Sequence, residues 1–318
     1  MSYRWVVKWS VLVIALLGPS GARAEDEMPA GTRTEDVIYA RKYGTALTMD
    51  VFTPKHGANG LGVIFVVSGG WASSHEGINP AWHAELLKRG YTVFCVVHGS
   101  QPLYTVPEIL EDMYRSARFI RFHAARYGID PDRIGVFGCS AGGHLSLMMG
   151  VAGQAGDPAA KDPVDRLSSR VQAVAAFCPP TDLLNYGQPG RDFLQALHEE
   201  LAPFHAPLDF REFDPKAKRF RLIQEKDRRR EIARQISPIT HVTRDDPPTL
   251  IIHGDADKLV WFQQAEVMIA RLAEAGVVNK LVVKPGAGHG WPDLLKDVVL
   301  VADWFDRHLG RLPASQPS

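Results

Sequence analysis

Two patterns of hydrophobic and polar positions alternate along the chain, and together they predict alternating strands and helices. Continuous apolar runs such as LGVIFVV (61–67) and YTVFCVV (91–97) are typical of strands buried on both faces of a parallel sheet. Between such runs, apolar residues recur every three or four positions, as on the core-facing side of a helix. We expect strands at 36–39, 46–52, 61–67, 91–97, 133–138, 171–177, 248–254 and 280–283, and helices at 80–89, 105–124, from 141 onward, 262–275 and 293–309.

This alternation predicts an α/β protein with a mostly parallel, doubly wound sheet and helices on both faces. Local signals support the helix at 105–124: Thr105 can cap it, Pro107 suits a first turn, and Glu108 completes a capping box. The segment 185–236 breaks the rhythm because it is long and highly charged. It can be a solvated helical face, a helical insertion that covers the active site as a lid, or both, and we favour an insertion near the site.

The N-terminal residues have the pattern of a secretory signal peptide. Arg4 and Lys8 precede the short apolar run 10–17, and Ala22-Arg23-Ala24 offers small residues for cleavage after Ala24. The run is shorter than the roughly 20 residues of a membrane span, although an uncleaved anchor or a lipid-facing tail is the alternative. We therefore expect a secreted or periplasmic protein with no stable membrane span after cleavage. The expected organisation is a signal peptide at 1–24, a flexible leader at 25–35, one catalytic domain at 36–309 with its insertion at 185–236, and a tail at 310–318.

Composition and charge narrow the classes of partner. Hydrophobic residues make up 45% of the 318 and charged residues 23%, as in ordinary soluble globular proteins. Cleavage after Ala24 removes three basic residues and no acidic ones, which leaves a small net negative charge and argues against nucleic acid as a partner. Cys95, Cys139 and Cys178 are odd in number and lack zinc spacing, so we expect neither a disulfide framework nor a zinc site. Nothing in the sequence indicates the oligomeric state.

The stretch GCSAGGH (138–144) joins a predicted strand to a predicted helix and carries a G-x-S-x-G pattern around Ser140. Glycine weakens both strands and helices, so a simple turn would not need so many. In a tight strand–turn–helix, small neighbours let the two elements pass closely while the serine oxygen points outward. Ser140 would then lie at the carboxyl edge of the sheet, where ligands bind in open parallel sheets.

A nucleophilic serine needs a base that a third group orients, and these follow in the chain order Ser, Asp or Glu, His. His289 lies in the glycine-rich loop GAGHGW after one predicted strand, and Asp255 and Asp257 follow another. Position alone leaves both aspartates open. The oxyanion hole needs backbone N–H groups, and we expect them from Ala141, next to the serine, and from glycines of the loop VSGGW. We assign Gly69 and Gly70 to that role, with Ala141 as the third donor.

From about residue 36 to 309 the chain resembles the α/β-hydrolases, especially carboxylesterases near the hormone-sensitive-lipase and the feruloyl- or acetylxylan-esterase branches. The resemblance implies that Ser140 is the nucleophile, His289 the general base, and Asp257 rather than Asp255 the acid. The resemblance rests on the stretches GTALTMDVFTP, SGGW, YGIDPDRIGVFGCSAGGHLS, SPITHV, PPTLIIHGDADKLV and GAGHGW.

Two loops depart from the family pattern and leave the substrate preference open. Val67-Ser68-Gly69-Gly70 stands where the family usually has His-Gly-Gly-Gly, and His98-Gly99-Ser100-Gln101 stands where it often has Tyr-Arg-Leu. His98 or Gln101 could touch substrate, although a supporting loop role is favoured for each. We expect Asp255 to support its turn and His144 to pack rather than act as a second base.

The predicted function is hydrolysis of a carboxylic ester through an acyl-enzyme, without a cofactor. A small-molecule or polysaccharide-linked ester is the expected substrate. A prolyl-oligopeptidase-like exopeptidase is one alternative, although too few residues precede the hydrolase pattern to build the propeller of such enzymes. A catalytically inactive binding protein on the same fold is the other alternative.

Overall fold

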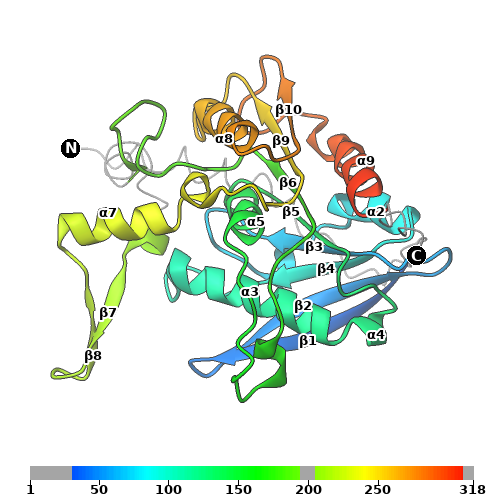
Figure 1. The fold of residues 1–318 in the computed structure, drawn as a ribbon, viewed down its shortest axis with the longest axis horizontal. Coiled ribbons are helices and arrows are strands. Elements are labelled where there is room, and N and C mark those ends of the chain that lie inside the picture. The colour runs from blue at the N-terminus through cyan, green and yellow to red at the C-terminus, as the bar shows by residue number, and fades with distance from the viewer. Residues whose placement is uncertain (1–30, 194–204, 311–318) are drawn as a thin grey trace, which may run out of the picture.

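The computed structural model describes residues 31–193 and 205–310, whose strands form an eight-stranded sheet and a separate two-stranded sheet. The order in the large sheet is β1-β2-β4-β3-β5-β6-β9-β10 (Figure 1). β1 and β2 pair antiparallel, β2 pairs antiparallel with β4, and all later neighbours are parallel. The strands are β1 (Gly31–Lys42), β2 (Thr45–Pro54), β3 (Gly62–Val67), β4 (Thr92–Val97), β5 (Ile134–Cys139), β6 (Ala173–Phe177), β9 (Thr249–Gly254) and β10 (Asn279–Lys284).

Helices cover both faces of this sheet, which confirms the predicted α/β architecture. Successive residues of β3 point to opposite faces, so Ile64 belongs to one core and Val63 and Phe65 to the other. The first core lies under α3, α5 and α8, and the second under α2 and α9 (Figure 1). The helices of the two layers are α2 (Ala84–Lys88), α3 (Val106–Phe122), α4 (Ala124–Tyr127), α5 (Ala141–Val151), α8 (Gln263–Glu274) and α9 (Val298–His308).

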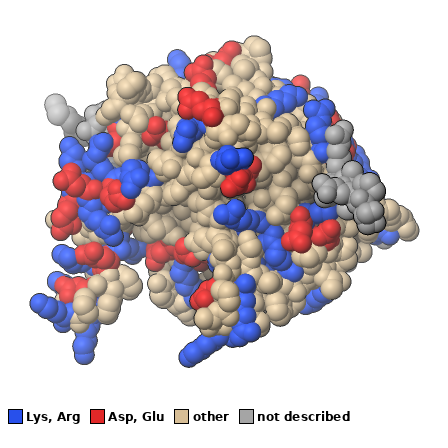
Figure 2. Space-filling view, in the orientation of Figure 1, with Lys and Arg blue, Asp and Glu red and all other residues tan. Residues whose placement is uncertain are grey.

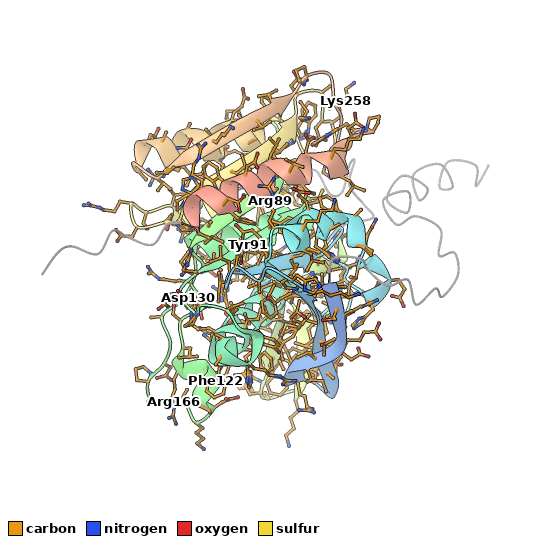
Figure 3. The ribbon with its side chains drawn as sticks, turned by 90° about the vertical axis from the view of Figure 1, so that its right-hand side faces the viewer. Arg89, Tyr91, Phe122, Asp130, Arg166 and Lys258 are labelled. Carbon is orange, nitrogen blue, oxygen red and sulfur yellow. The ribbon has the colours of Figure 1, made fainter. Side chains whose placement is uncertain are left out.

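A polar cluster joins α2 to α9 on the outside of the second core. Arg89 Nη1 lies 2.7 Å from Asp303 Oδ1 and 2.6 Å from Asp306 Oδ2, and the Tyr91 hydroxyl donates to Asp306 Oδ1 at 2.7 Å. Figure 3 labels Arg89 and Tyr91 beside the ribbon of α9. Within the part of the chain that is described, no helix is long and apolar enough to cross a membrane.

Several boundaries differ from the sequence-based expectation. β1 begins at Gly31, so residues 31–35 of the expected flexible leader form strand instead. Their side chains are mostly exposed, and an exposed edge strand lacks the apolar alternation that reveals buried ones. The expected helix at 80–89 divides into a 3₁₀ turn, Pro80–Trp82, and α2. The predicted signal peptide at 1–24 and, apart from Gly310, the expected tail at 310–318 lie outside the described residues.

The segment 185–236 is only partly helical, which corrects the expectation of a helical insertion. Its described part contains a hairpin of β7 (Arg211–Asp214) and β8 (Arg219–Leu222), followed by α7 (Lys226–Gln235). The hairpin projects from the body of the molecule (Figure 1), and Lys and Arg side chains gather over this region (Figure 2). Arg211 Nη2 donates to the carbonyls of Pro102 and Leu103, which places the base of the hairpin beside the loop after β4. A lid function for this segment stays a prediction.

Candidate active site

Ser140 occupies a strained turn between β5 and α5. Its backbone has φ +55° and ψ −119°, a conformation that costs a non-glycine residue free energy. The Ser140 N–H donates to the carbonyl of Phe177 at 2.8 Å, which ties the turn to the end of β6. A Cβ atom on Gly138 would lie 2.5 Å from backbone atoms of Gly142, and one on Gly142 would lie 2.8 Å from the carbonyl oxygen of Val66. The glycines are therefore required for the close passage of strand, helix and neighbouring strand.

Ser140, His289 and Asp257 meet in one hydrogen-bonded line at the carboxyl edge of the sheet. His289 Nε2 lies 2.9 Å from Ser140 Oγ, and His289 Nδ1 lies 2.7 Å from Asp257 Oδ2. A carboxylate only accepts, so His289 Nδ1–H is the donor and Nε2 is free to accept the serine proton. Asp255, by contrast, is exposed and accepts the Gly286 N–H at 2.6 Å, which is the turn-supporting role predicted for it.

The Asp257 carboxylate is buried and accepts four hydrogen bonds. Oδ1 accepts the N–H groups of Leu259 at 2.9 Å and Val260 at 3.0 Å. Oδ2 accepts from His289 and also from Nε2 of His253, at 3.1 Å. Burial by itself raises the pKa of Asp257, but the hydrogen bonds that the carboxylate accepts from His253 and His289 outweigh burial and hold that pKa well below its usual range. The group is therefore ionised at neutral pH.

The loop after β3 reaches the same carboxyl edge of the sheet. In this loop, one N–H group expected in the oxyanion hole already has a hydrogen-bond acceptor. Gly69 N–H donates to the carbonyl of Ala72 at 3.0 Å, and Ala72 N–H returns the bond. This pairing corrects the assignment of Gly69 to the oxyanion hole, because its only backbone donor has a partner. Gly70 lines the space around Ser140, with φ +55°. Ala141 lines it too, and its N–H belongs to the first turn of α5, where no intrahelical acceptor exists.

The two loops that depart from the family pattern contact each other. Val67 and Val97 are register partners in β3 and β4, so the residues that follow them, Ser68 and His98, are neighbours. His98 Nδ1–H donates to the carbonyl of Gly99 at 2.7 Å, which leaves Nε2 to accept the Ser68 hydroxyl at 2.8 Å. Burial lowers the pKa of His98 to about 4, so the imidazole is neutral at neutral pH. His98 therefore supports the loop after β3, residues 68–75, which we call the glycine loop.

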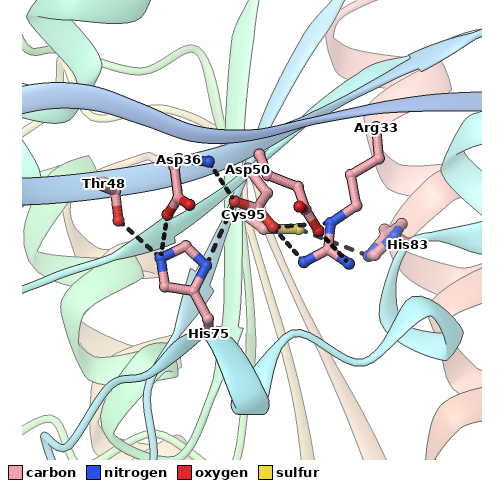
Figure 4. Close-up of polar contacts among 8 residues, drawn as sticks. Arg33, Asp36, Thr48, Asp50, His75, His83 and Cys95 are labelled. Carbon is pink, nitrogen blue, oxygen red and sulfur yellow. Dashed lines mark hydrogen bonds and ion pairs between the residues drawn. The ribbon is translucent and has the colours of Figure 1, made fainter. Parts of the chain in front are cut away.

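His75 fixes the far end of the glycine loop to the antiparallel part of the sheet (Figure 4). His75 Nε2 lies 2.8 Å from Thr48 Oγ1 and 3.3 Å from Asp36 Oδ1, and Nδ1 lies 3.4 Å from Asp50 Oδ1. Asp50 is fully buried and accepts from Arg33 Nε at 2.8 Å. The structure thus places His75 at a junction of three segments.

Trp71 and His144 connect the glycine loop to α5 and to the end of α7. Trp71 Nε1–H donates to His144 Nδ1 at 3.2 Å, and His144 Nε2–H donates to the carbonyl of Ile236 at 2.7 Å. Burial lowers the pKa of His144 to about 4. Both ring nitrogens are therefore engaged in structural bonds, which confirms that His144 packs and does not serve as a second base.

A small pocket of about 30 Å³ opens at Ser140. This is room for about one or two water molecules or a group of similar size. Its walls are mostly apolar and come from the glycine loop, α5 and the segments that follow β6 and β9. The lining residues are Gly70, Trp71, Ser140, Ala141, Pro180, Tyr186, Phe193, Leu259 and Val260.

Two groups of ligand-type side chains lie close enough to suggest a cation site. Among the described residues these are Cys178 with His253 and Asp257, and Asp36 with Asp50 and His75; in each group the ligand atoms lie within 4.8 Å of one another. Protein donors already engage both buried carboxylates, as described above. We therefore assign no metal to either group.

Comparison with known proteins identifies the family. A profile of the BD-FAE family matches residues 49–272, which include Ser140 and Asp257. The chain belongs to the BD-FAE family. Its eight-stranded, mostly parallel sheet has the α/β-hydrolase architecture that the sequence predicted.

Curated relatives of this BD-FAE chain carry esterase names. Esterase LipC of Mycobacterium tuberculosis (strain ATCC 25618 / H37Rv) is 32% identical over 239 residues, which cover 73% of this chain and 53% of LipC. The probable carboxylic ester hydrolase LipM of the same strain is 28% identical over 243 residues, covering 75% of this chain and 51% of LipM. The chain thus spans about half the length of these relatives.

A solved structure similar to this BD-FAE chain is a truncated form of a carbohydrate esterase from gut microbiota. The two superpose with a TM-score of 0.69 at 26% identity, over 90% of this chain and 99% of the esterase.

The sequence did not reveal every residue that surrounds the candidate site of this BD-FAE chain. His253 contacts the same carboxylate oxygen as His289, yet it lies within an apolar strand and belongs to no motif that required it. Its only sequence signal is its place in HGDAD, four residues before Asp257.

Proposed function

We propose that this chain is a serine hydrolase that cleaves carboxylic esters. The observation that carries the proposal is the line from Ser140 Oγ through the His289 imidazole to Asp257 Oδ2, with contacts of 2.9 and 2.7 Å. A serine hydroxyl alone is a weak nucleophile, and an oriented imidazole is what activates it. The esterase names of relatives and of the similar solved structure support the same reaction class.

The proposed reaction follows from where each proton lies. Ser140 Oγ attacks the ester carbonyl carbon while its proton moves to His289 Nε2, and the N–H groups of Gly70 and Ala141 stabilise the oxyanion. The C–O bond to the alcohol breaks as the alcohol takes the proton from His289, which leaves an acyl-enzyme. Water then attacks the acyl carbon with His289 again as base, and the carboxylic acid leaves. Asp257 keeps the proton on Nδ1 throughout.

The size of the pocket at Ser140 favours short acyl groups. A space of about 30 Å³ walled by Trp71, Tyr186 and Phe193 suits an acetyl group. The carbohydrate esterase among the similar structures supports a sugar-linked ester as the substrate class. The predicted signal peptide, if cleaved after Ala24, would bring the enzyme to extracellular or periplasmic polysaccharide.

A fluorophosphonate probe tests the proposal because it reacts only with an activated serine. We expect stoichiometric labelling of the wild-type chain and none of Ser140→Ala, together with hydrolysis of 4-nitrophenyl acetate. The rates of hydrolysis of an octanoate ester and of methyl ferulate, measured beside that of acetylated xylan, rank the acyl groups that the enzyme accepts. A folded wild-type chain that neither reacts with the probe nor hydrolyses any ester would favour the inactive binding protein instead.

A further inference from the structure

His253 is a buried histidine that contacts the proposed catalytic acid from inside the sheet. It lies on β9, its side chain is fully buried, and its Nε2 lies 3.1 Å from Asp257 Oδ2 and 2.9 Å from the carbonyl oxygen of Val260. The Phe262 ring stands nearly perpendicular to the imidazole, with centroids 5.7 Å apart. The mechanism described above does not use this residue.

The proton of His253 can be placed from its neighbours. Both atoms near Nε2 are oxygens that only accept, a carboxylate and a backbone carbonyl, so Nε2 carries the proton. Nδ1 is buried and has no hydrogen-bond partner among the described residues. A proton on Nδ1 would therefore be buried without an acceptor, which is costly. The surroundings thus lock one orientation of the ring, in which its single N–H is shared between the Asp257 carboxylate and the Val260 carbonyl.

We infer that His253 is a positioning residue for ester hydrolysis, whose Nε2–H holds Oδ2 of Asp257 in place and limits the basicity of His289. This inference rests on the proposed function of the Ser140 site. Oδ2 is the oxygen that also accepts from His289, so the two imidazoles share its negative charge. A donor that withdraws charge from Oδ2 weakens the stabilisation that Asp257 offers to a protonated His289.

Removal of the His253 donor should have two effects of different kinds. More charge on Oδ2 favours the protonated form of His289, so the acid limb of the rate profile moves to higher pH. A less restrained carboxylate orients His289 less well, so kcat falls. A residue that only filled space would produce the second effect without the first.

The other ionisable groups around His253 and Asp257 do not interfere with this readout. Cys178, after β6, lies close to both residues, whereas His289, on the loop after β10, and Cys139, at the end of β5, interact with Asp257. Burial raises the pKa of Cys139 to about 12 and that of Cys178 well above its usual range. Both thiols therefore stay protonated between pH 5 and 9, and the acid limb reports on His289.

The experiment measures kcat and kcat/KM for 4-nitrophenyl acetate across that pH range in three variants. His253→Leu removes the donor, and we expect its acid-limb midpoint to rise by about half a pH unit and its kcat to fall about fivefold. His253→Gln keeps an N–H at the reach of Nε2, and we expect it to restore the wild-type midpoint. His83→Leu is the matched control, because His83 is also fully buried but lies in the second core against Phe52 and Cys95.

The outcomes separate this inference from the proposed function. An unchanged midpoint in a folded His253→Leu overturns the inference and leaves the esterase proposal standing. A wild-type chain without labelling or turnover overturns the esterase proposal, and the inference with it. If His253→Leu does not fold, His253→Asn replaces it, since its shorter amide does not reach Oδ2; a midpoint unchanged there overturns the inference equally.

Discussion

Replacement of Asp257 by asparagine is the change whose consequence the structure defines most sharply. Oδ1 accepts two backbone N–H groups, from Leu259 and Val260, so the asparagine carbonyl oxygen must take that position. The amide NH₂ then stands where Oδ2 was, facing the N–H groups of His253 and His289. The reverse orientation sets the NH₂ against the two backbone donors and is worse.

The favoured orientation, with the NH₂ group toward His289, inverts the tautomer of His289, and this sets the size of the effect. To meet an NH₂ group, Nδ1 must become the acceptor, and the proton moves to Nε2. A protonated Nε2 cannot accept the proton of the Ser140 hydroxyl, whose Oγ lies 2.9 Å from Nε2. Wrong-tautomer variants of such triads lose about 10⁴ in kcat, equivalent to about 5–6 kcal/mol of transition-state stabilisation. The buried donor left facing His253 should also lower the free energy of unfolding by about 1–3 kcal/mol.

The assay is kcat for 4-nitrophenyl acetate at pH 7.5, with a thermal melt to confirm that the variant is folded. Asp255→Asn serves as the control, because Asp255 is exposed and only accepts the Gly286 N–H. We expect that variant to keep its kcat within a few-fold of wild type. A folded Asp257→Asn enzyme with more than a tenth of the wild-type kcat, or equal losses in both variants, would refute the reasoning.

Two further predictions concern folding and pH. Gly138→Ala should lower the free energy of unfolding by about 1–3 kcal/mol in urea melts, because its Cβ would lie 2.5 Å from the Gly142 backbone. Gly69→Ala is the control and should be nearly neutral, because no atom lies within 4 Å of its Cβ. Equal losses of stability in the two variants would contradict the packing argument. Buried His98 and His144 have pKa values lowered to about 4, so below about pH 6.5 the unfolded chain binds protons that the folded chain does not. The free energy of unfolding should fall as the pH is lowered from 6.5 to 4, by about 1.4 kcal/mol per pH unit for each histidine. In urea melts at several pH values, the free energy of unfolding of His144→Gln should depend less steeply on pH than that of the wild type.

Much of the fold was predictable because its signals are local. The six positions of β3 are apolar and all buried, and Thr105 and Glu108 mark the start of α3 through a bond between near neighbours. The elbow at Ser140 was predictable for the same reason, since its glycines lie within two residues of the serine. β1 escaped detection at its start because its exposed side chains carry no periodic pattern.

The sequence by itself determined the strand–helix alternation, the serine elbow and the order in which the acid and base follow it. Only the tertiary structure decided which aspartate contacts His289. It also decided that the Gly69 N–H donates to the Ala72 carbonyl and that His253 and His289 share one carboxylate oxygen. The physical reason is that a hydrogen bond depends on the positions of two atoms in space. Periodicity and motifs describe what each segment can offer, whereas the partner of each donor is set by strand register and loop paths that bring distant residues within 3 Å.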